Sequence, residues 1–391
     1  MNVLREYFGR NVRQYGIFAA LLVIVLLFWG LTGGSLLAPD NVASLIQQNA
    51  YVMILAIGMV AVIVAGHIDL SVGSVVAFIG GLTAIMLAHW GWPVWAAVLA
   101  SLVLGAVVGV WQGFWIAYVG IPAFIVTLAG MLIFRGLAIV LVGETVSSLP
   151  KSFNAIGIGS LPNVLGFAAG EMDVVTLLIG AFAVVGLVVS QVRARAALVR
   201  HELSVEPLPI FVGKLVVIGA LIALVTYWLS LSRGGTPIIL LILGVLILGF
   251  AFVLNRTVFG RHVYAVGGNR NAAILSGVNA RRTDFMIFVN MGVLSAIAAV
   301  ATTARAGAGV AAAGTNFELD AIAACFIGGT AVSGGVGRIS GAMVGALIMG
   351  VLNKGLSILA VDPAWQQVIK GLVLLLAVAL DIVSKRRNAL R

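Results

Sequence analysis

The residue types that do chemistry are sparse in this sequence, and they are not grouped as a catalytic site requires. Thirteen Asp and Glu, four His and one Cys occur among 391 residues. The sequence has no acidic cluster able to hold a metal, and no glycine-rich Gly-Lys-Ser/Thr loop of the kind that cradles nucleotide phosphates. We therefore expect no catalytic residues, no metal site and no cofactor, and no ATP hydrolysis by this chain itself.

The segment 255–284 has a pattern suited to binding another macromolecule. Between a Gly-Gly pair (267–268) and an Arg-Arg pair (281–282) lies a short apolar stretch, for which Asn271 is a candidate N-cap. A short helix flanked by basic residues either lies on lipid headgroups or inserts into a groove of a soluble partner. Its small side chains offer little area for anchoring in lipid, which favours the partner, but this pattern alone leaves both interpretations open.

Polar and aromatic side chains within the apolar runs are candidates to line a path for a polar solute. Binding sites for polar solutes combine amide or hydroxyl partners with apolar and aromatic surface. Each such residue, taken singly, is more typical of helix packing. The candidates are Gln112, Trp115, Phe124, Asn290, Phe326 and Asn353.

The elements that must position these residues are membrane-spanning helices. Hydrophobic residues make up 62% of the chain and charged residues 9%, whereas soluble domains carry about 25% charged residues. The apolar runs are long enough to cross a bilayer as helices. Basic residues stand at the ends of these runs, so the net charge of +10 indicates topology and no nucleic-acid partner. The sequence predicts an all-α, polytopic transmembrane helical bundle with the lipid bilayer as its solvent.

Apolar runs and their breakers predict about twelve spans. The tenth is short and glycine-broken, so three alternatives stay open: a full span, a half-helix, or a re-entrant segment buried in protein. The expected spans are 16–33, 50–67, 71–90, 94–117, 122–142, 172–192, 210–231, 237–255, 285–304, 319–333, 339–360 and 366–384.

The distribution of Lys and Arg predicts the orientation. If both termini are cytoplasmic, sixteen basic residues fall on the inside, including those of the segment 255–284, and three fall on external loops. An excess of basic residues marks cytoplasmic loops. The three external residues are Lys151, Arg233 and Arg305. We expect them to contact acidic groups of an external partner, since complementary charge speeds encounter and fixes register.

Several long motifs in one order resemble a known group of transporters. They are IDLSVGS at 68–74, IPAFIVTLAGMLIFRG at 121–136, GRHVYAVGGNRNAAILSGVNARRTD at 260–284 and ELDAIAACFIGGTAVSGGVGRISGAMVGALIMGVLNKGLSIL at 318–359, followed by a last span ending in basic residues. Together they resemble the monosaccharide permeases of bacterial ABC importers, which include ribose, xylose, galactose and multiple-sugar permeases. Branched-chain amino acid permeases are more distant relatives of that group.

The resemblance implies one permease domain over 1–391 in the bacterial inner membrane. Ribose-type members have about ten spans, and the insertion at 193–235 that adds two is similar to the xylose and multiple-sugar permeases. It implies import of a pentose such as xylose, or of several aldoses. The implied partners are an ABC ATPase subunit, a periplasmic sugar-binding protein and a second permease copy, forming a homodimer.

The resemblance also assigns the segment 255–284 a role. Family permeases present a cytoplasmic coupling helix to a groove in the ATPase, so the partner interpretation gains support. The matching positions are Gly268, Asn269, Ala272, Leu275, Ser276 and Gly277.

Two alternatives stay open. An ABC permease for another small polar solute, such as an autoinducer sugar, a nucleoside or a branched-chain amino acid, would carry similar motifs. An ion-coupled secondary transporter needs paired acidic residues at mid-membrane and usually an inverted repeat. The sequence shows isolated charges and no clear repeat, which makes this second alternative the weaker one.

Overall fold

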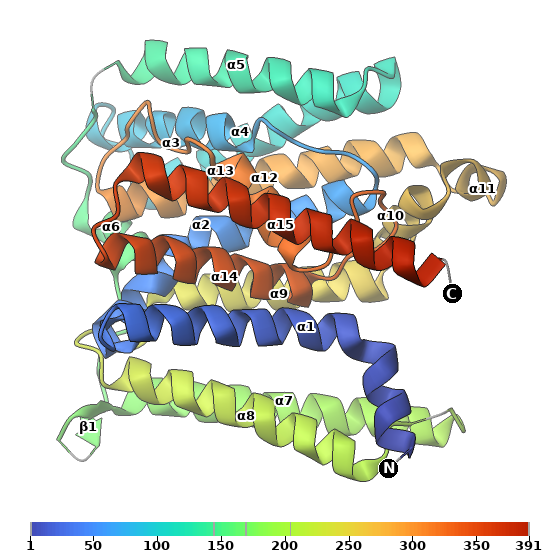
Figure 1. Cartoon of the computed structure of the whole chain (residues 1–391). Coiled ribbons are helices and arrows are strands. Elements are labelled where there is room, and N and C mark those ends of the chain that lie inside the picture. Colours follow the sequence, from blue (N-terminus) through green and yellow to red (C-terminus); the bar gives the residue numbers. More distant parts are fainter. Residues whose placement is uncertain (1, 144, 169, 204, 390–391) are drawn as a thin grey trace. The chain divides into compact units, whose positions relative to one another are not determined.

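Helices form nearly all of the computed structural model, which describes residues 2–143, 145–168, 170–203 and 205–389 (Figure 1). The α-helices are α1 (Asn2–Leu31), α2 (Pro39–Val64), α3 (Val72–Ala88), α4 (Val94–Phe114), α5 (Ala123–Val142), α6 (Lys151–Ile158), α7 (Val174–Arg200), α8 (Leu208–Ser230), α9 (Ile238–Arg256), α10 (Val258–Gly268), α11 (Arg270–Leu275), α12 (Ala280–Ala306), α13 (Phe317–Ile327), α14 (Ile339–Ile358) and α15 (Pro363–Ala389). A 3₁₀-helix, η1, covers Ser35–Leu37, a π-helix, η2, covers Trp115–Val119, and the short strands β1 (Phe167–Ala168) and β2 (Met172–Asp173) form an antiparallel pair.

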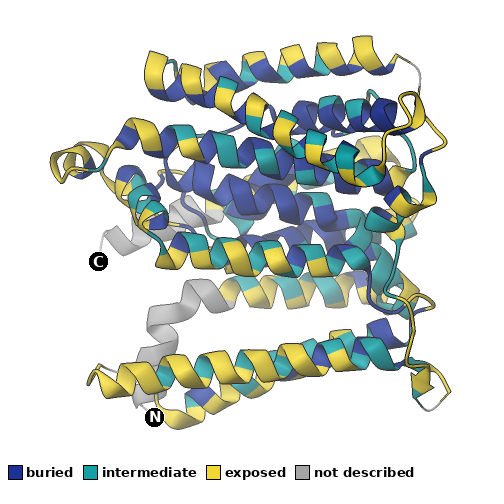
Figure 2. Cartoon of the chain, turned by 180° about the vertical axis from the view of Figure 1, so that it is seen from behind, coloured by how far each residue is buried: buried dark blue, intermediate teal, exposed yellow. Residues whose placement is uncertain are grey.

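The chain divides into two compact units. The larger holds residues 1–36, 45–158 and 239–391, and therefore most of the helices and the whole segment 255–284. The smaller holds residues 37–44 and 159–238, with α7, α8 and the β1–β2 pair. Within the smaller unit, α7 packs against α8, and most of both helices is exposed (Figure 2).

Helix α2 forms the centre of the larger unit. From Val52 to Val64 its side chains are almost completely buried. This stretch is apolar on every side, which is typical of a helix surrounded by other helices. Dark blue residues concentrate on the inner helices of this unit in Figure 2. The C-terminal half of α2 is therefore enclosed by other helices of this unit.

Glycines allow the closest helix contacts. A methyl group at Gly292 of α12 would overlap the carbonyl of Gly105 on α4, and one at Gly345 of α14 would overlap the carbonyl of Ala324 on α13. Small residues at such positions let membrane helices approach backbone to backbone. Gly341 has the same kind of contact, with the carbonyl of Gly328.

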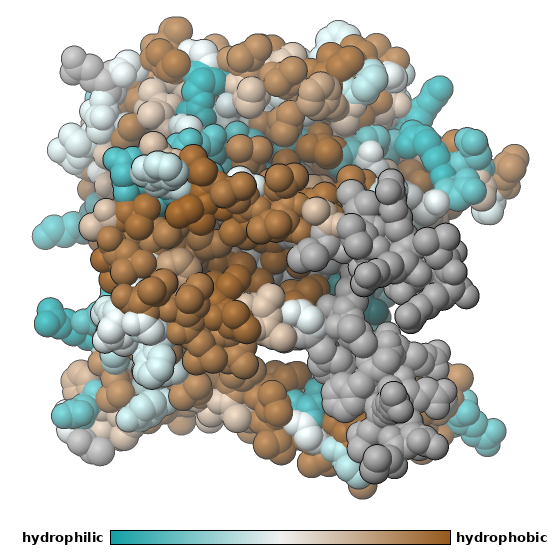
Figure 3. Space-filling model, in the orientation of Figure 1, coloured by the Kyte–Doolittle hydropathy of each residue, from teal (hydrophilic) through white to brown (hydrophobic). Residues whose placement is uncertain are grey.

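The outer helices present apolar surface. Val140 on α5, Phe182 on α7 and Leu248 on α9 are each more than 70% exposed. On the face drawn in Figure 3, hydrophobic side chains cover the middle of the helices of the larger unit, and hydrophilic ones gather toward the ends. Such a surface suits lipid, because a soluble protein rarely exposes apolar patches of this extent.

Among the described residues, eight helices are long and apolar enough to cross a membrane: α2, α4 continued through η2, α5, α7, α8, α9, α12 and α14. The apolar part of α1 (Gly16–Leu31) and α3 are shorter apolar helices. The all-α membrane bundle is confirmed, while the total of twelve spans and the orientation remain predictions. Helix α13 has 11 residues, about 16 Å at 1.5 Å per residue, against a hydrocarbon core of about 30 Å. Helix α13 alone is therefore too short to cross the hydrocarbon core, as expected of a half-helix or a re-entrant segment.

Candidate functional site

Three capping side chains divide the segment 255–284 into short helices. The hydroxyl of Thr257 accepts a hydrogen bond from the Gly260 N–H and begins α10. The Asn269 Oδ1 accepts one from the Ala272 N–H at 3.0 Å and begins α11. Asn279 caps α12 in the same way. These are the side chains preferred at N-caps.

The prediction of Asn271 as the N-cap was wrong. Asn269 has an extended backbone with φ −155°, so its side chain reaches back over the first turn, whereas Asn271 already lies within α11. The helix begins at Arg270 and ends at Leu275. Its 6 residues make less than two turns, so the helix is shorter than the apolar stretch of the sequence.

Helix α11 has one anchored face and one free face. Ala273 is buried against Val266 and Ala280, and this small cluster fastens the helix to α10 and α12. On the other face the Leu275 side chain is 89% exposed and Ile274 is 50% exposed. Apolar side chains presented to solvent on a fixed helix are typical of a docking surface.

The six predicted coupling positions all lie on this exposed surface. Gly268 ends α10, Asn269 caps α11, and Gly277 follows α11 with φ +85°. The Ser276 hydroxyl donates to the Ala272 carbonyl at 2.9 Å and so finishes the helix. The exposed residues are Gly268, Asn269, Ala272, Leu275, Ser276 and Gly277. The structure therefore brings them together.

The connection from α10 to α11 packs directly on the end of α2. A methyl group at Gly267 would overlap the Val64 carbonyl, and that carbonyl accepts a hydrogen bond from the Gly335 N–H at 2.8 Å. The Tyr264 hydroxyl donates to the Gly337 carbonyl at 2.7 Å. Burial raises the pKa of the Tyr264 phenol, so it remains a hydrogen-bond donor near neutral pH. The segment is thus joined to α2 and to the loop between α13 and α14.

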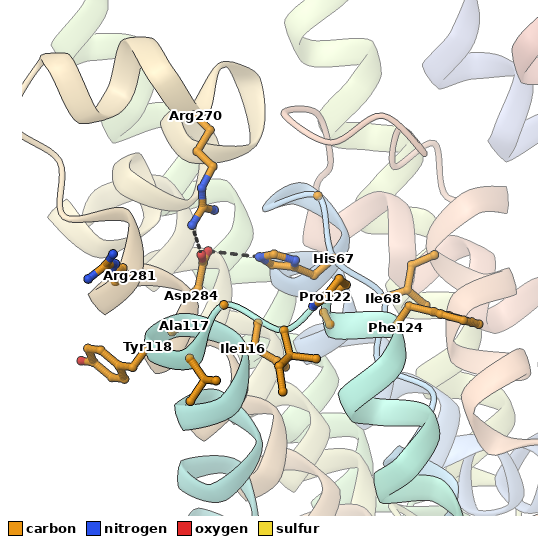
Figure 4. Close-up of a pocket in the computed structure, with 15 residues that line it drawn as sticks. His67, Ile68, Ile116, Ala117, Tyr118, Pro122, Phe124, Arg270, Arg281 and Asp284 are labelled. Atoms are coloured by element: carbon orange, nitrogen blue, oxygen red, sulfur yellow. Dashed lines mark ion pairs between the residues drawn. The ribbon is translucent and has the colours of Figure 1, made fainter.

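A cavity of about 500 Å³ lies beside α11 (Figure 4). It is lined by the α2–α3 link at 66–68, by residues 116–124, and by Arg270, Arg281 and Asp284. The Asp284 side chain is 1% exposed, and its Oδ2 lies 2.7 Å from the Arg270 Nη2. Its Oδ1 lies 3.2 Å from the His67 Nε2. In Figure 4 both dashed lines meet at the Asp284 carboxylate.

The contact with His67 has the distance of an ion pair without hydrogen-bond geometry. Neither His67 Nε2 nor Asp284 Oδ1 has a hydrogen-bond partner within the described part of the chain. The contact with Arg270 is therefore the stronger of the two. Sequence reasoning missed this cluster, because His67 is more than 200 positions from the other two residues, and Arg270 and Asp284 belong to different helices. Only the acidic type of Asp284, close after two arginines, gave any signal.

The path candidates occupy six different elements. Gln112 on α4 is buried, and its amide donates to the Ser71 hydroxyl, which in turn donates to Asp69 at 2.7 Å. Phe124 on α5 is half exposed and lines the cavity. The others, which do not line it, are Trp115 in η2, Asn290 on α12, Phe326 on α13 and Asn353 on α14. Asn290 and Asn353 each have a buried amide atom without a partner in the part of the chain that is described.

Two of the basic residues predicted to be external belong to the larger unit, and one belongs to the smaller unit. Arg305 is exposed in the last turn of α12, whose 27 residues extend about 40 Å, and Asp284 lies in the first two turns of the same helix. Lys151 begins α6, which packs on α12. In the smaller unit, the Arg233 N–H donates to Asp40 at 3.0 Å, and its guanidinium lies 3.6 Å from the same carboxylate. Arg233 is therefore already paired, whereas Lys151 and Arg305 share one packed pair of helices.

No cluster of three or more potential metal ligands occurs among the described residues. The lone thiol, Cys325, is buried and donates to the Ala56 carbonyl. The site therefore consists of an exposed helix, a buried ion pair and close backbone packing.

Comparisons with known proteins identify relatives that cover nearly the whole chain. The chain is 43% identical to the xylose transport system permease protein XylH of Escherichia coli (strain K12) over 380 residues, which covers 97% of this chain and 94% of that protein. It is 41% identical to the corresponding protein of Haemophilus influenzae, covering 96% of this chain and 98% of that one. It is 31% identical to the ribose import permease protein RbsC of Escherichia coli (strain K12), with 96% of each chain covered. No solved structure matches.

The resemblance seen in the motifs is thereby confirmed over nearly the whole length. The family described as the permease component of the branched-chain amino acid transport system matches residues 41–378. Its match includes the whole segment 255–284, the cavity and the half-helix α13. The chain belongs to this family of permease components.

Proposed function

We propose that this chain is the membrane-embedded permease subunit of an ATP-driven importer for xylose or a related pentose. One observation carries the proposal, namely the 43% identity to a xylose permease over 97% of the chain. The lower identity to ribose permeases keeps the substrate within the pentoses. The apolar helices make it a multi-pass protein of the inner membrane.

The exposed helix α11 supports a division of labour. In this proposal the helix seats in a groove of the ATPase subunit, with Leu275 as the anchoring side chain and the other coupling positions around it. ATP is hydrolysed by that partner, since this sequence has no phosphate-binding loop. A second copy of the chain completes the permease as a homodimer.

The proposed topology has about twelve spans and places both termini and the segment 255–284 in the cytoplasm. The Lys and Arg excess supports it, and so does α12, which carries α11's partner Asp284 near one end and Arg305 at the other. A cysteine introduced at Arg270 should react only with reagents that reach the cytoplasm, and external labelling would contradict this orientation.

Lys151 and Arg305 are proposed to meet the sugar-binding protein. The packing of α6 on α12, where Gly157 meets the Arg305 backbone, supports a shared basic surface, and Arg233 is the weaker candidate because it is paired with Asp40. Gln112, Trp115, Phe124, Asn290, Phe326 and Asn353 remain candidates to line the path. A permease supplied by a binding protein needs little sugar affinity of its own.

The substrate is tested in a bacterial strain that lacks its own xylose permease. The chain is expressed with a xylose ATPase subunit and, in separate strains, a xylose-, a ribose- or a leucine-binding protein, and uptake of the matching radiolabelled solute is measured. We expect xylose uptake above the empty-vector level, ribose at a lower rate and no leucine uptake. Leucine uptake without xylose uptake would replace the proposal by an amino acid permease, which the family description makes the second candidate.

A further inference from the structure

One buried carboxylate joins three separate segments of the larger unit. Asp284 belongs to α12, Arg270 is the first residue of α11, and His67 lies between α2 and α3. Figure 4 shows Arg270 and His67 reaching the carboxylate from different directions, while Arg281 lies apart from it without an ion pair. The contact is therefore a junction between the exposed helix and two helices of the core.

The charges make this junction resistant to separation. The Asp284 side chain is 1% exposed, so its charge depends on Arg270 for compensation. A buried charge that loses its partner is strongly unfavourable. The Arg270 side chain is 44% exposed, so it lies at the boundary between the cavity and solvent. Any displacement of α11 is then transmitted to Asp284 more easily than the pair is broken.

The backbone packing beside it directs the movement. Gly267 and Gly268 contact Val64 and Gly335 with no side chain between them, and the Gly335 N–H is bonded to the Val64 carbonyl. Close contact of this kind transmits a push, while the ion pair transmits a pull. Both lead to α2 and α12, which are among the most buried helices of the unit.

We infer that Asp284 is a positioning residue that passes the displacement of α11 to the transmembrane helices, with Arg270 as its essential partner. The inference rests on the proposed function, because it assumes that an ATPase moves α11. It goes further by naming the link through which that movement reaches α12 and α2. Loss of the link leaves α11 free to bind the ATPase, but it separates hydrolysis from sugar movement.

The test compares sugar transport with ATP hydrolysis in the complete importer. The permease, its ATPase and the binding protein are reconstituted in proteoliposomes, and xylose taken up per ATP hydrolysed is measured. The variants are Asp284→Asn, Arg270→Gln and the double variant, in which a neutral pair avoids an unpaired buried charge. Arg200→Gln is the matched control, because Arg200 is exposed in the last turn of α7, outside the segment 255–284 and the cavity.

We expect each of the three variants to retain ATPase binding and to lose about tenfold or more in xylose per ATP, as fits the removal of a buried charge pair. Arg200→Gln should keep the wild-type ratio, and Arg270→Lys should retain part of it. A purely structural ion pair predicts a different pattern, in which the neutral double variant recovers both abundance and the wild-type ratio. That recovery would overturn the inference.

The two proposals fail in different ways. Absence of xylose uptake by the wild-type protein would refute the proposed function. Normal uptake by the wild type together with an unchanged ratio of xylose to ATP in Arg270→Gln would refute the positioning role of Asp284 but leave the proposed function intact. Should Asp284→Asn not accumulate in the membrane, the double variant and Arg270→Gln decide the question.

Discussion

Replacement of Leu275 by Ala should weaken the permease's hold on its ATPase. The Leu275 side chain is 89% exposed, so it contributes little to the fold and is almost fully available to a partner. The substitution removes three carbon atoms, each worth about 0.8 kcal/mol when buried, or roughly 2 kcal/mol in total. At about 1.4 kcal/mol per factor of ten, the affinity of one α11 helix for its groove falls roughly 30-fold.

The affinity is measured by titrating purified ATPase subunit onto the permease in nanodiscs. Leu203→Ala is the matched control, because this leucine is 56% exposed in the link after α7, outside the segment 255–284. We expect a large loss for Leu275→Ala and none for Leu203→Ala, with equal amounts of both variants in the membrane. An unchanged affinity for Leu275→Ala would show that α11 is not the anchoring helix.

Three further predictions concern other parts of the chain. Ala272→Trp should abolish ATPase retention at normal abundance, measured by co-purification, because a bulky ring cannot enter a groove shaped for a small residue; full retention would indicate a helix lying on lipid headgroups. Gly292→Leu should lower the unfolding temperature in detergent, since its side chain would meet the α4 backbone, whereas Gly244→Leu, with open space around it, should not. Arg305→Glu should weaken docking of the binding protein more at low salt than at high salt, measured by surface plasmon resonance; equal docking at both would exclude this contact.

The sequence was informative wherever a local pattern decides the structure. Apolar runs located the long helices, and the Gly-Gly and Arg-Arg pairs delimited the region of α11. The glycine-broken run at 319–333 indicated an interrupted helix, and α13 has only 11 residues. Glu318 and Asp320 lie in the first turn of that helix, where negative charge is favourable.

Contacts between distant segments could not be predicted in this way. Asn269 and Asn271 are equally good capping residues, and only the backbone at the end of α10 selects Asn269. The approach of His67 to Asp284 depends on where α2 ends relative to α12, a relation between residues 217 positions apart. The path candidates likewise need the positions of six elements, and of the six only Phe124 lines the cavity.

Uptake of xylose by proteoliposomes containing this chain, an ATPase subunit and a xylose-binding protein tests the account most directly. We expect radiolabelled xylose to accumulate only when ATP is present on the cytoplasmic side and the binding protein on the external side. Accumulation should be absent when the ATPase is omitted. Accumulation driven by an ion gradient without ATP, or none under any of these conditions, would contradict the account.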